Sequence, residues 1–274
     1  MLTTGLVISM GAAAAGGFEI EMGAAETADH GIERSPQLGT LPVGSLADLL
    51  RNGDAVFGLF SRDKTPEEGA ELAMNRDTDF IFYSMETGPF DIPRMDGFMQ
   101  GMLAAAPADG THPTALRIPP IRDGREEARQ RVAEALAVGV DAIVYPHVES
   151  AEEAALSVDM IGEAGWPGNP NGKVINVLLI EDQVGVANAR AIVSTPGVSV
   201  VIPGPGDLNR AYDRDPEAVE SAIQAVLAAC KEFEVPCGIT AGVDDIAERL
   251  DQGFRMIIAS RPDPLPIGRR HVGR

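Results

Sequence analysis

Cysteine and basic residues are scarce in this chain of 274 residues. The two cysteines, Cys230 and Cys237, are too few for a disulfide framework and are predicted to be a helix thiol and a strand thiol, both buried. Lys and Arg number 22 against 41 Asp and Glu, which gives a formal charge of −19. A field of that sign repels polyphosphates and anionic lipids, so we expect neither nucleic acid nor membrane as a partner.

No hydrophobic run is a convincing membrane span. The nearest candidate, residues 2–17, is short, rich in Gly and Ala, and lacks the preceding Lys or Arg that a secretory signal needs. We therefore predict a cytoplasmic protein whose residues 1–43 form an N-terminal arm, with 18–43 as a linker. A periplasmic or secreted protein is the alternative, if residues 2–17 are the remnant of a signal segment.

Apolar residues make up 45% of the chain, which is ample for a core, and residues 44–274 follow a regular pattern. Strand-like apolar runs alternate eight times with helix-like segments, and continuous runs of this kind are typical of parallel strands buried on both faces. The predicted strands are 55–60, 80–85, 114–119, 141–146, 174–180, 198–202, 236–240 and 254–259. Eight such units predict a (β/α)8 barrel of the TIM type. A doubly wound open sheet is the runner-up, but no Gly-x-Gly-x-x-Gly motif follows the first strand.

Local signals place the helices between these strands. Capping boxes are predicted to begin helices at Thr65 and Ser150, each with Glu three residues later. Single helices are also predicted over residues 184–193 and 215–233, while residues 165–172 are predicted to be a loop. Three prolines lie between residues 261 and 274, so no full helix is expected there.

A turn of Gly and Pro that ends in a carboxylate, Asp207, follows the sixth predicted strand, in the sequence IPGPGDL at residues 202–208. Glycines let a ligand approach the backbone N–H groups closely. Glu181 ends the fifth strand, and two acids at the ends of neighbouring strands predict a site for a divalent cation with oxygen ligands. The alternative is that Asp207 caps the next turn and Glu181 forms a salt bridge. Three more polar residues follow other strands at the end where a barrel carries its chemistry, namely Glu86, Arg117 and His147.

Five stretches carry a resemblance to a known family. They are DFIFYSMETGPFD (79–91), ALRIP (115–119), VYPHVESA (144–151), LIEDQVGVAN (179–188) and GVSVVIPGPGDL (197–208). The last two, in this order and at this spacing, are the most specific. On these motifs, residues 45–260 resemble the HpcH/HpaI aldolases, class II metal-dependent lyases whose barrels belong to the pyruvate/phosphoenolpyruvate superfamily.

The resemblance implies aldol cleavage or addition through a pyruvate enolate, with Mg²⁺ or Mn²⁺ as cofactor. It makes Glu181 and Asp207 the metal ligands, with Glu86 supporting the site through bound water. It makes Arg117 the donor to the oxygen shared by the 2-oxo group and the enolate. It also implies that the N–H groups of Gly206 and Asp207, with Leu208 beside them, bind the carboxylate of pyruvate. Such roles suit an enolate, whose negative charge gathers on one oxygen.

The sequence departs from the family pattern at the residues that move protons. Asp-x-Glu-His is usual after the second strand, whereas this chain has Ser84 and Thr87 in place of the Asp and the His. The acid that usually partners that His appears as Ala137, and a usual Gln near the metal ligands appears as Leu179. The usual His–Asp pair is therefore absent from the sequence.

Three accounts of this absence stay open. Another base serves, with His147 as the first candidate because it sits at the catalytic end of the barrel and histidine is a common general base, and Tyr83 and Tyr145 as lesser ones. Metal-bound water or hydroxide moves the proton. Or the protein binds a 2-oxo acid or dicarboxylate without turning it over.

The sequence thus predicts a metal-dependent carbon–carbon lyase of the aldolase type, acting on a small 2-oxo acid. The alternatives are a non-catalytic barrel that binds 2-oxo acids or dicarboxylates, and a related lyase or decarboxylase with an altered substrate. A phosphotransferase or hydrolase is disfavoured because no Lys- or Arg-rich phosphate loop is visible. Barrel lyases of this type commonly assemble, so a homo-oligomer is expected.

Overall fold

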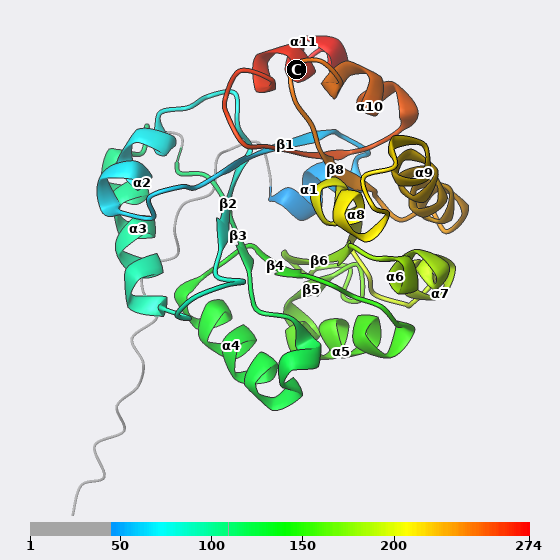
Figure 1. The fold of residues 1–274 in the computed structure, drawn as a ribbon. Coiled ribbons are helices and arrows are strands. Elements are labelled where there is room, and N and C mark those ends of the chain that lie inside the picture. The colour runs from blue at the N-terminus through cyan, green and yellow to red at the C-terminus, as the bar shows by residue number, and fades with distance from the viewer. Residues whose placement is uncertain (1–44, 109) are drawn as a thin grey trace, which may run out of the picture. The chain divides into compact units, whose positions relative to one another are not determined.

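The computed structural model describes residues 45–108 and 110–274, and these form a barrel of parallel strands surrounded by helices (Figure 1). The predicted arm, residues 1–43, and its signal-like run lie outside the described residues. The barrel strands are β1 (Val56–Phe60), β2 (Phe80–Ser84), β3 (Thr114–Arg117), β4 (Ala142–Tyr145), β6 (Val174–Ile180), β7 (Val200–Pro203), β8 (Gly238–Thr240) and β9 (Met256–Ala259). These correspond to the eight predicted strands, so the predicted TIM-type barrel is confirmed.

The strands pair in the order in which they occur along the chain. Neighbours from β1 to β7 pair in parallel, and β9 joins β8 to β1. The ring closes between β7 and β8 through an isolated bridge between Val201 and Cys237. A two-residue strand, β5 (Gly165–Trp166), adds to the amino end of β6 inside the stretch predicted as a loop.

Helices follow the strands and lie around the ring, as Figure 1 shows. They are α2 (Pro66–Ala73), α3 (Ile92–Ala105), α4 (Arg125–Val138), α5 (Ala151–Ile161), α6 (Gln183–Ala187), α7 (Ala189–Val193), α8 (Pro205–Ala211), α9 (Pro216–Glu232), α10 (Ile246–Gln252) and α11 (Leu265–Val272). Short 3₁₀ turns, η1 (Ile121–Asp123) and η2 (Gly162–Ala164), precede α4 and follow α5. No described helix is long and apolar enough to cross a membrane.

Two apolar layers hold the barrel together, because alternate residues of a strand point to opposite faces. One layer fills the barrel interior with side chains such as Phe80, Phe82 and Ile202. The helix α1 (Leu46–Arg51) adds Leu46, Ala47, Leu49 and Leu50 to this inner layer. The other layer lies between the strands and the surrounding helices and includes all the buried methionines of α3.

The structure adds detail to three local predictions. Residues 184–193 form two short helices that meet at Asn188, whose side chain donates to the carbonyl of Glu149 (2.8 Å). The turn after β7 continues into the helix α8, which was not predicted. The C-terminal segment, residues 261–274, is not a full helix, as expected, but part of it forms the eight-residue helix α11. Its last proline, Pro266, stands at the second helical position, where proline costs no hydrogen bond.

The predicted capping boxes are half formed. Thr65 and Ser150 each accept from the N–H of the Glu three residues on, at 3.2 Å, as predicted. The side chain of Glu68, however, accepts from the N–H groups of Arg62 and Lys64, both at 2.6 Å. Glu68 therefore holds the loop between β1 and α2 rather than closing its own box.

Candidate active site

The predicted site residues gather at the carboxyl end of the barrel because each follows or ends a parallel strand. Arg117 ends β3, and Glu181 follows β6 directly. Glu86 and His147 each lie two residues beyond a strand, β2 and β4 respectively. Asp207 lies in the first turn of α8, beyond β7.

The carboxylate of Glu181 is the buried centre of this arrangement, with only 4% of the residue exposed. Its Oε2 accepts from the backbone N–H of His147 (2.9 Å). Gly204 packs directly against it, because a Cβ at that position would lie 2.7 Å from Glu181 Cγ and 2.8 Å from Oε1. The Gly-Pro-Gly turn therefore needs its first glycine so that the chain can pass beside Glu181.

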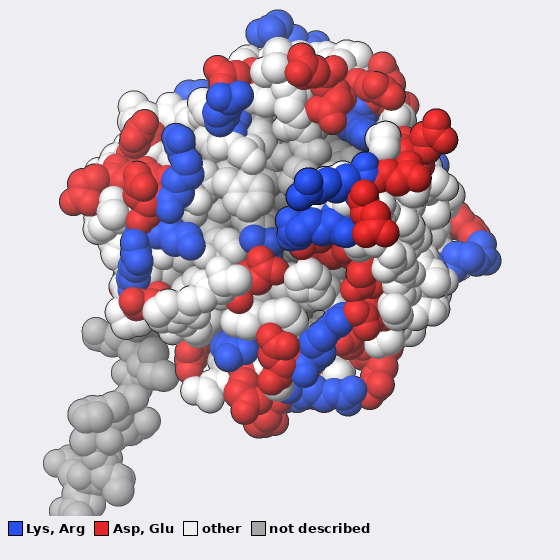
Figure 2. Space-filling view, in the orientation of Figure 1, with Lys and Arg blue, Asp and Glu red and all other residues white. Residues whose placement is uncertain are grey.

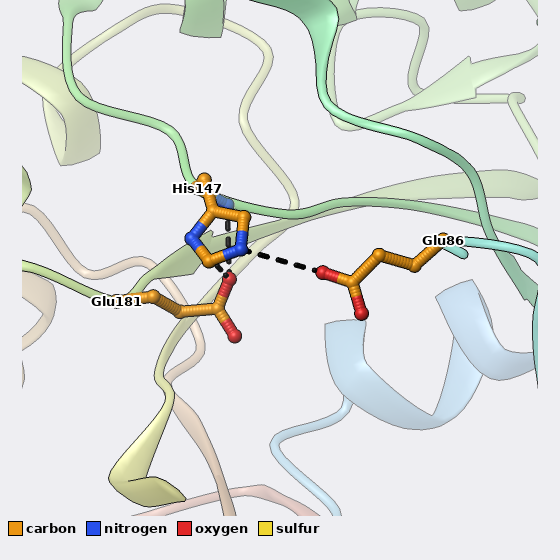
Figure 3. Close-up of side chains that lie close together, drawn as sticks. All are labelled: Glu86, His147 and Glu181. Atoms are coloured by element: carbon orange, nitrogen blue, oxygen red, sulfur yellow. Dashed lines mark hydrogen bonds and ion pairs between the residues drawn. The ribbon is translucent and has the colours of Figure 1, made fainter. Parts of the chain in front are cut away.

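His147 lies between two carboxylates, as Figure 3 shows. Its Nδ1 is 3.3 Å from Glu181 Oε2 and its Nε2 is 3.4 Å from Glu86 Oε1. The backbone at His147 has φ of +54°, a left-handed conformation that costs a residue with a Cβ energy and is found more often at functional sites. Strain of this kind is maintained here by the hydrogen bond to Glu181.

Three residues of one stretch hold the guanidinium of Arg117. Glu86 pairs with it at 2.9 Å through Oε2, and Ser84 Oγ accepts from its Nε at 2.9 Å. The ring of Phe82 lies beneath it, 5.5 Å from ring centroid to Cζ. Residues 82, 84 and 86 alternate along the chain, so β2 and its extension present them on the same face. Arg117 is thereby fixed at the barrel mouth beside Glu86.

Asp207 is placed differently from Glu181. It is partly exposed and forms an ion pair with Arg210 one turn along α8. Among the described residues, the acids and histidines whose ligand atoms all lie within 4.8 Å of one another are Glu86, His147 and Glu181, so Asp207 stands outside that group. Its charge nevertheless acts on Glu181, whose pKa it helps to raise.

The residues next to Asp207 have separate environments. Gly206 and Asp207 are in the first turn of α8, where N–H groups lack acceptors within the helix. A Cβ at Gly206 would meet nothing within 4 Å, so the space beside it is open. Leu208 is fully buried in the outer apolar layer, and its N–H donates to the carbonyl of Gly204 (2.9 Å).

Burial raises the pKa of Glu181 to about 7. The hydrogen bond from His147 N–H and the charge of Arg117 oppose this shift, while the charges of Asp207 and Glu86 add to it. A buried carboxylate with neighbouring acids and no direct Lys or Arg partner among the described residues is costly to ionise. A divalent cation would relieve that cost, so the donor set fits such an ion.

The two tyrosines considered as bases do not face this group. Tyr83 and Tyr145 belong to the outer layer between strands and helices, and Tyr145 donates to the carbonyl of Ser157 (3.2 Å). Burial raises the pKa of Tyr83 to about 12 and that of Tyr145 further still. Neither is placed for proton transfer at the barrel mouth.

Comparison with known proteins decides the family. The model of the family described as HpcH/HpaI aldolase/citrate lyase matches residues 57–259. The chain belongs to this family. The resemblance seen in the sequence motifs is therefore confirmed, and the family is one of lyases.

Three known proteins illustrate how similar this chain is to others. A hydroxypyruvate/pyruvate aldolase of Paraburkholderia phytofirmans is 26% identical, over 77% of this chain and 89% of that protein. A family protein from Burkholderia cenocepacia has a solved structure with a TM-score of 0.68 at 24% identity, covering 83% of this chain and 97% of that one. The citrate lyase β subunit of Mycobacterium tuberculosis, solved with oxaloacetate and magnesium, has a TM-score of 0.58 at 17% identity, covering 81% and 98%.

Sequence reasoning located these HpcH/HpaI family positions but missed how they interact. It treated Ser84 as a departure from the family pattern, whereas Ser84 accepts a hydrogen bond from Arg117. It related Glu86 to the metal site through bound water, with a place at the surface as the alternative, whereas Glu86 forms an ion pair with Arg117. The alternation of residues 82, 84 and 86 was the available signal, because a strand places such residues on one face.

Proposed function

We propose that this protein is a metal-dependent carbon–carbon lyase of the aldolase type that acts on a 2-oxo acid through a pyruvate enolate. The observation that carries the proposal is the buried Glu181 carboxylate, which lies beside His147 at the mouth of the barrel. His147 in turn contacts Glu86, and Glu86 pairs with Arg117. Aldolase names among the relatives support the proposal.

Mg²⁺ or Mn²⁺ is the proposed cofactor, with Glu181 and Asp207 as ligands and Glu86 in support through water. Carboxylate oxygens are the ligands that these cations prefer. When bound, such an ion stabilises negative charge on the substrate oxygen as a Lewis acid. The magnesium in the structure of the M. tuberculosis citrate lyase β subunit is consistent with this choice.

The chain's own residues bind and orient the 2-oxo acid. Arg117 would donate to the 2-oxo oxygen, where negative charge develops as the carbon–carbon bond breaks. Because Ser84 and Glu86 already fix the guanidinium, little reorganisation is needed at that moment. The free N–H groups of Gly206 and Asp207 would bind the substrate carboxylate, with Leu208 packed beneath them.

His147 is the proposed base. In cleavage it would accept the proton of the hydroxyl group at C4, as the C3–C4 bond breaks to leave an aldehyde and the enolate. It would then return a proton to C3 to give pyruvate. The ring lies between Glu86 and Glu181, so an imidazolium there would have a carboxylate on each side. This role would replace the His–Asp pair whose positions hold Thr87 and Ala137.

Exchange of the pyruvate methyl protons tests the function. The purified chain, given Mn²⁺ or Mg²⁺ in deuterated water, should incorporate deuterium into pyruvate, as followed by NMR. A chelator should abolish the exchange, and added metal should restore it. Saturable pyruvate binding without any exchange would instead indicate the non-catalytic carboxylate-binding barrel.

The His147→Gln variant is expected to lower the exchange rate constant about 10²–10³-fold, the usual contribution of a general base. Its backbone N–H can still donate to Glu181, so Mn²⁺ affinity should change only a few-fold. His271→Gln is the matched control, because His271 lies on α11 and pairs with Asp251. A His147→Gln variant with near-normal exchange would favour proton transfer by water.

The Ser84→Ala variant is expected to lower kcat/KM about 10-fold, since it removes a hydrogen bond to the charged Arg117. Ser84→Asp should keep most of the activity because it retains an acceptor. Ser61→Ala serves as control, because Ser61 likewise lies at the end of a strand but its hydroxyl donates to the carbonyl of Phe82 (3.3 Å) rather than to a charged group. Unchanged kinetics in Ser84→Ala would show that Arg117 needs no support from this hydroxyl.

A further inference from the structure

We propose that Cys230 and Cys237 form an intramolecular disulfide that ties the end of α9 to the start of β8. Their sulfur atoms are 2.6 Å apart, nearer than the roughly 3.5–4.0 Å at which non-bonded carbon atoms pack. Both residues are buried, with 1% and 2% exposed. They are thiols in this structure, and oxidation would join them with little movement.

The backbone around both cysteines is fixed, which keeps the sulfur atoms together. Cys237 forms the bridge to Val201, and its carbonyl accepts from the N–H of Arg255 (2.7 Å). The carbonyl of Cys230 accepts from the N–H of Val235 (3.0 Å), which closes the connection between α9 and β8. Both side chains point into the same apolar layer.

The position of the pair gives the disulfide a structural role. Between β7 and β8 the barrel is closed by the single bridge at Cys237, together with the bond from Val201 N–H to the carbonyl of Pro236 (3.2 Å). Every other neighbouring pair of barrel strands shares a register of at least three residues. A covalent link at Cys237 would therefore hold the start of β8 against α9, which itself packs on β7, at the joint with the fewest backbone contacts.

The chemistry is a thiol–disulfide exchange with a low-molecular-weight disulfide as oxidant. One cysteine thiolate attacks the oxidant and releases one small thiol, which leaves a mixed disulfide. The second cysteine then displaces the other small thiol. In total two cysteine thiols lose their hydrogens, one S–S bond forms in the protein, and one oxidant disulfide becomes two thiols.

Burial determines when this exchange can happen. Burial and the neighbouring Cys230 raise the pKa of Cys237 well above its usual value, so in the folded protein the thiol is protonated and shielded. We therefore expect the bond to form as the chain folds, before α9 covers β8. Once formed, it should resist reductants that cannot unfold the protein.

Refolding under defined redox conditions tests the proposal. The full chain, unfolded and reduced, is refolded either in a mixture of oxidised and reduced glutathione or with reductant throughout. The oxidised sample should lose about 2 Da in intact mass, for two hydrogen atoms, and show no thiols on alkylation in denaturant. Its melting temperature should exceed that of the reduced sample by about 3–8 °C. The mass, thiol and melting measurements are made with chelator present.

Two single variants, Cys230→Ala and Cys237→Ala, provide the control, because neither can close the bond and neither should melt differently in the two buffers. Both cysteines lie at the amino end of the barrel, so the oxidised and reduced wild-type proteins should perform pyruvate exchange equally, whichever way that assay turns out. Two alkylatable thiols, or glutathione adducts, in the wild type after oxidative refolding would overturn the proposal. So would an unchanged melting temperature in the oxidised protein.

Discussion

Replacing Glu181 with Gln is expected to abolish binding of Mn²⁺ and to stabilise the metal-free protein. Burial raises the pKa of Glu181 to about 7, whereas in the unfolded chain it returns to about 4.5. The protonated form is therefore the one that the folded state favours. Its stabilising contribution is complete below pH 4.5 and is lost as the pH rises through 7.

Gln keeps the shape of Glu and can still accept the hydrogen bond from His147, but it carries no charge to bury. In chelator at pH 8, Glu181→Gln should raise the free energy of unfolding by about 1–3 kcal/mol. At pH 4.5 the gain should be near zero. Denaturant unfolding at the two pH values measures the difference, and isothermal titration measures the loss of Mn²⁺ binding.

Two other variants test whether the gain in stability and the loss of Mn²⁺ binding are specific to Glu181. Asp207→Ala should also lose Mn²⁺ binding and activity, but with a smaller gain in stability, because burial is the main cause of the raised pKa of Glu181 and the charge of Asp207 adds only part of it. Glu152→Gln, at an exposed ion pair with Arg125, should change neither property. Tight Mn²⁺ binding that survives both Glu181→Gln and Asp207→Ala would contradict the proposed metal site.

Replacing Arg117 with Ala is expected to separate metal binding from turnover. The variant should bind Mn²⁺ within a few-fold of the wild-type affinity, because Arg117 is a cation and no metal ligand. Its kcat/KM should fall about 10²–10³-fold, the usual cost of one donor to a developing oxyanion. Loss of Arg117 also leaves Glu86 without its cationic partner beside the site.

Arg125→Ala is the control for this prediction, because it removes an exposed guanidinium from the first turn of α4. Arg117→Lys should recover only part of the activity. Lys keeps the charge but lacks the planar guanidinium, which donates to Ser84 and to Glu86 at the same time. If Arg117→Ala lost Mn²⁺ along with turnover, Arg117 would be holding the metal site in shape rather than binding substrate.

Charge around the barrel is consistent with an anionic substrate in spite of the formal charge of −19. On the face drawn in Figure 2, basic and acidic side chains are interspersed rather than separated into regions of one sign. Ion pairs such as Arg210 with Asp207 and Arg122 with Glu149 bring opposite charges together among the described residues. A small carboxylate therefore meets neighbouring charges of both signs at this surface.

The sequence by itself determined the barrel and the edge at which its strand-end polar residues gather. Eight continuous apolar runs, each followed by a helical pattern, fix the order of strands, since a strand buried on both faces must be apolar throughout. The polar residues that end those runs then share one edge of the barrel. The sequence did not determine where every helix begins and ends. One helix was predicted over residues 184–193, but Asn188 divides this stretch into α6 and α7.

Only the tertiary structure decided which of these residues touch. His147 meets Glu86 and Glu181 because β2, β4 and β6 end at the same edge of the barrel, with β4 beside β6 and only β3 between β4 and β2. No local pattern encodes the distances between their side chains. Tertiary structure also separates Asp207 from the other acids. Asp207 lies in α8, a helix that the sequence did not reveal, and pairs there with Arg210. Strand order follows from periodicity along the chain, whereas contacts between side chains depend on how the ring closes around them.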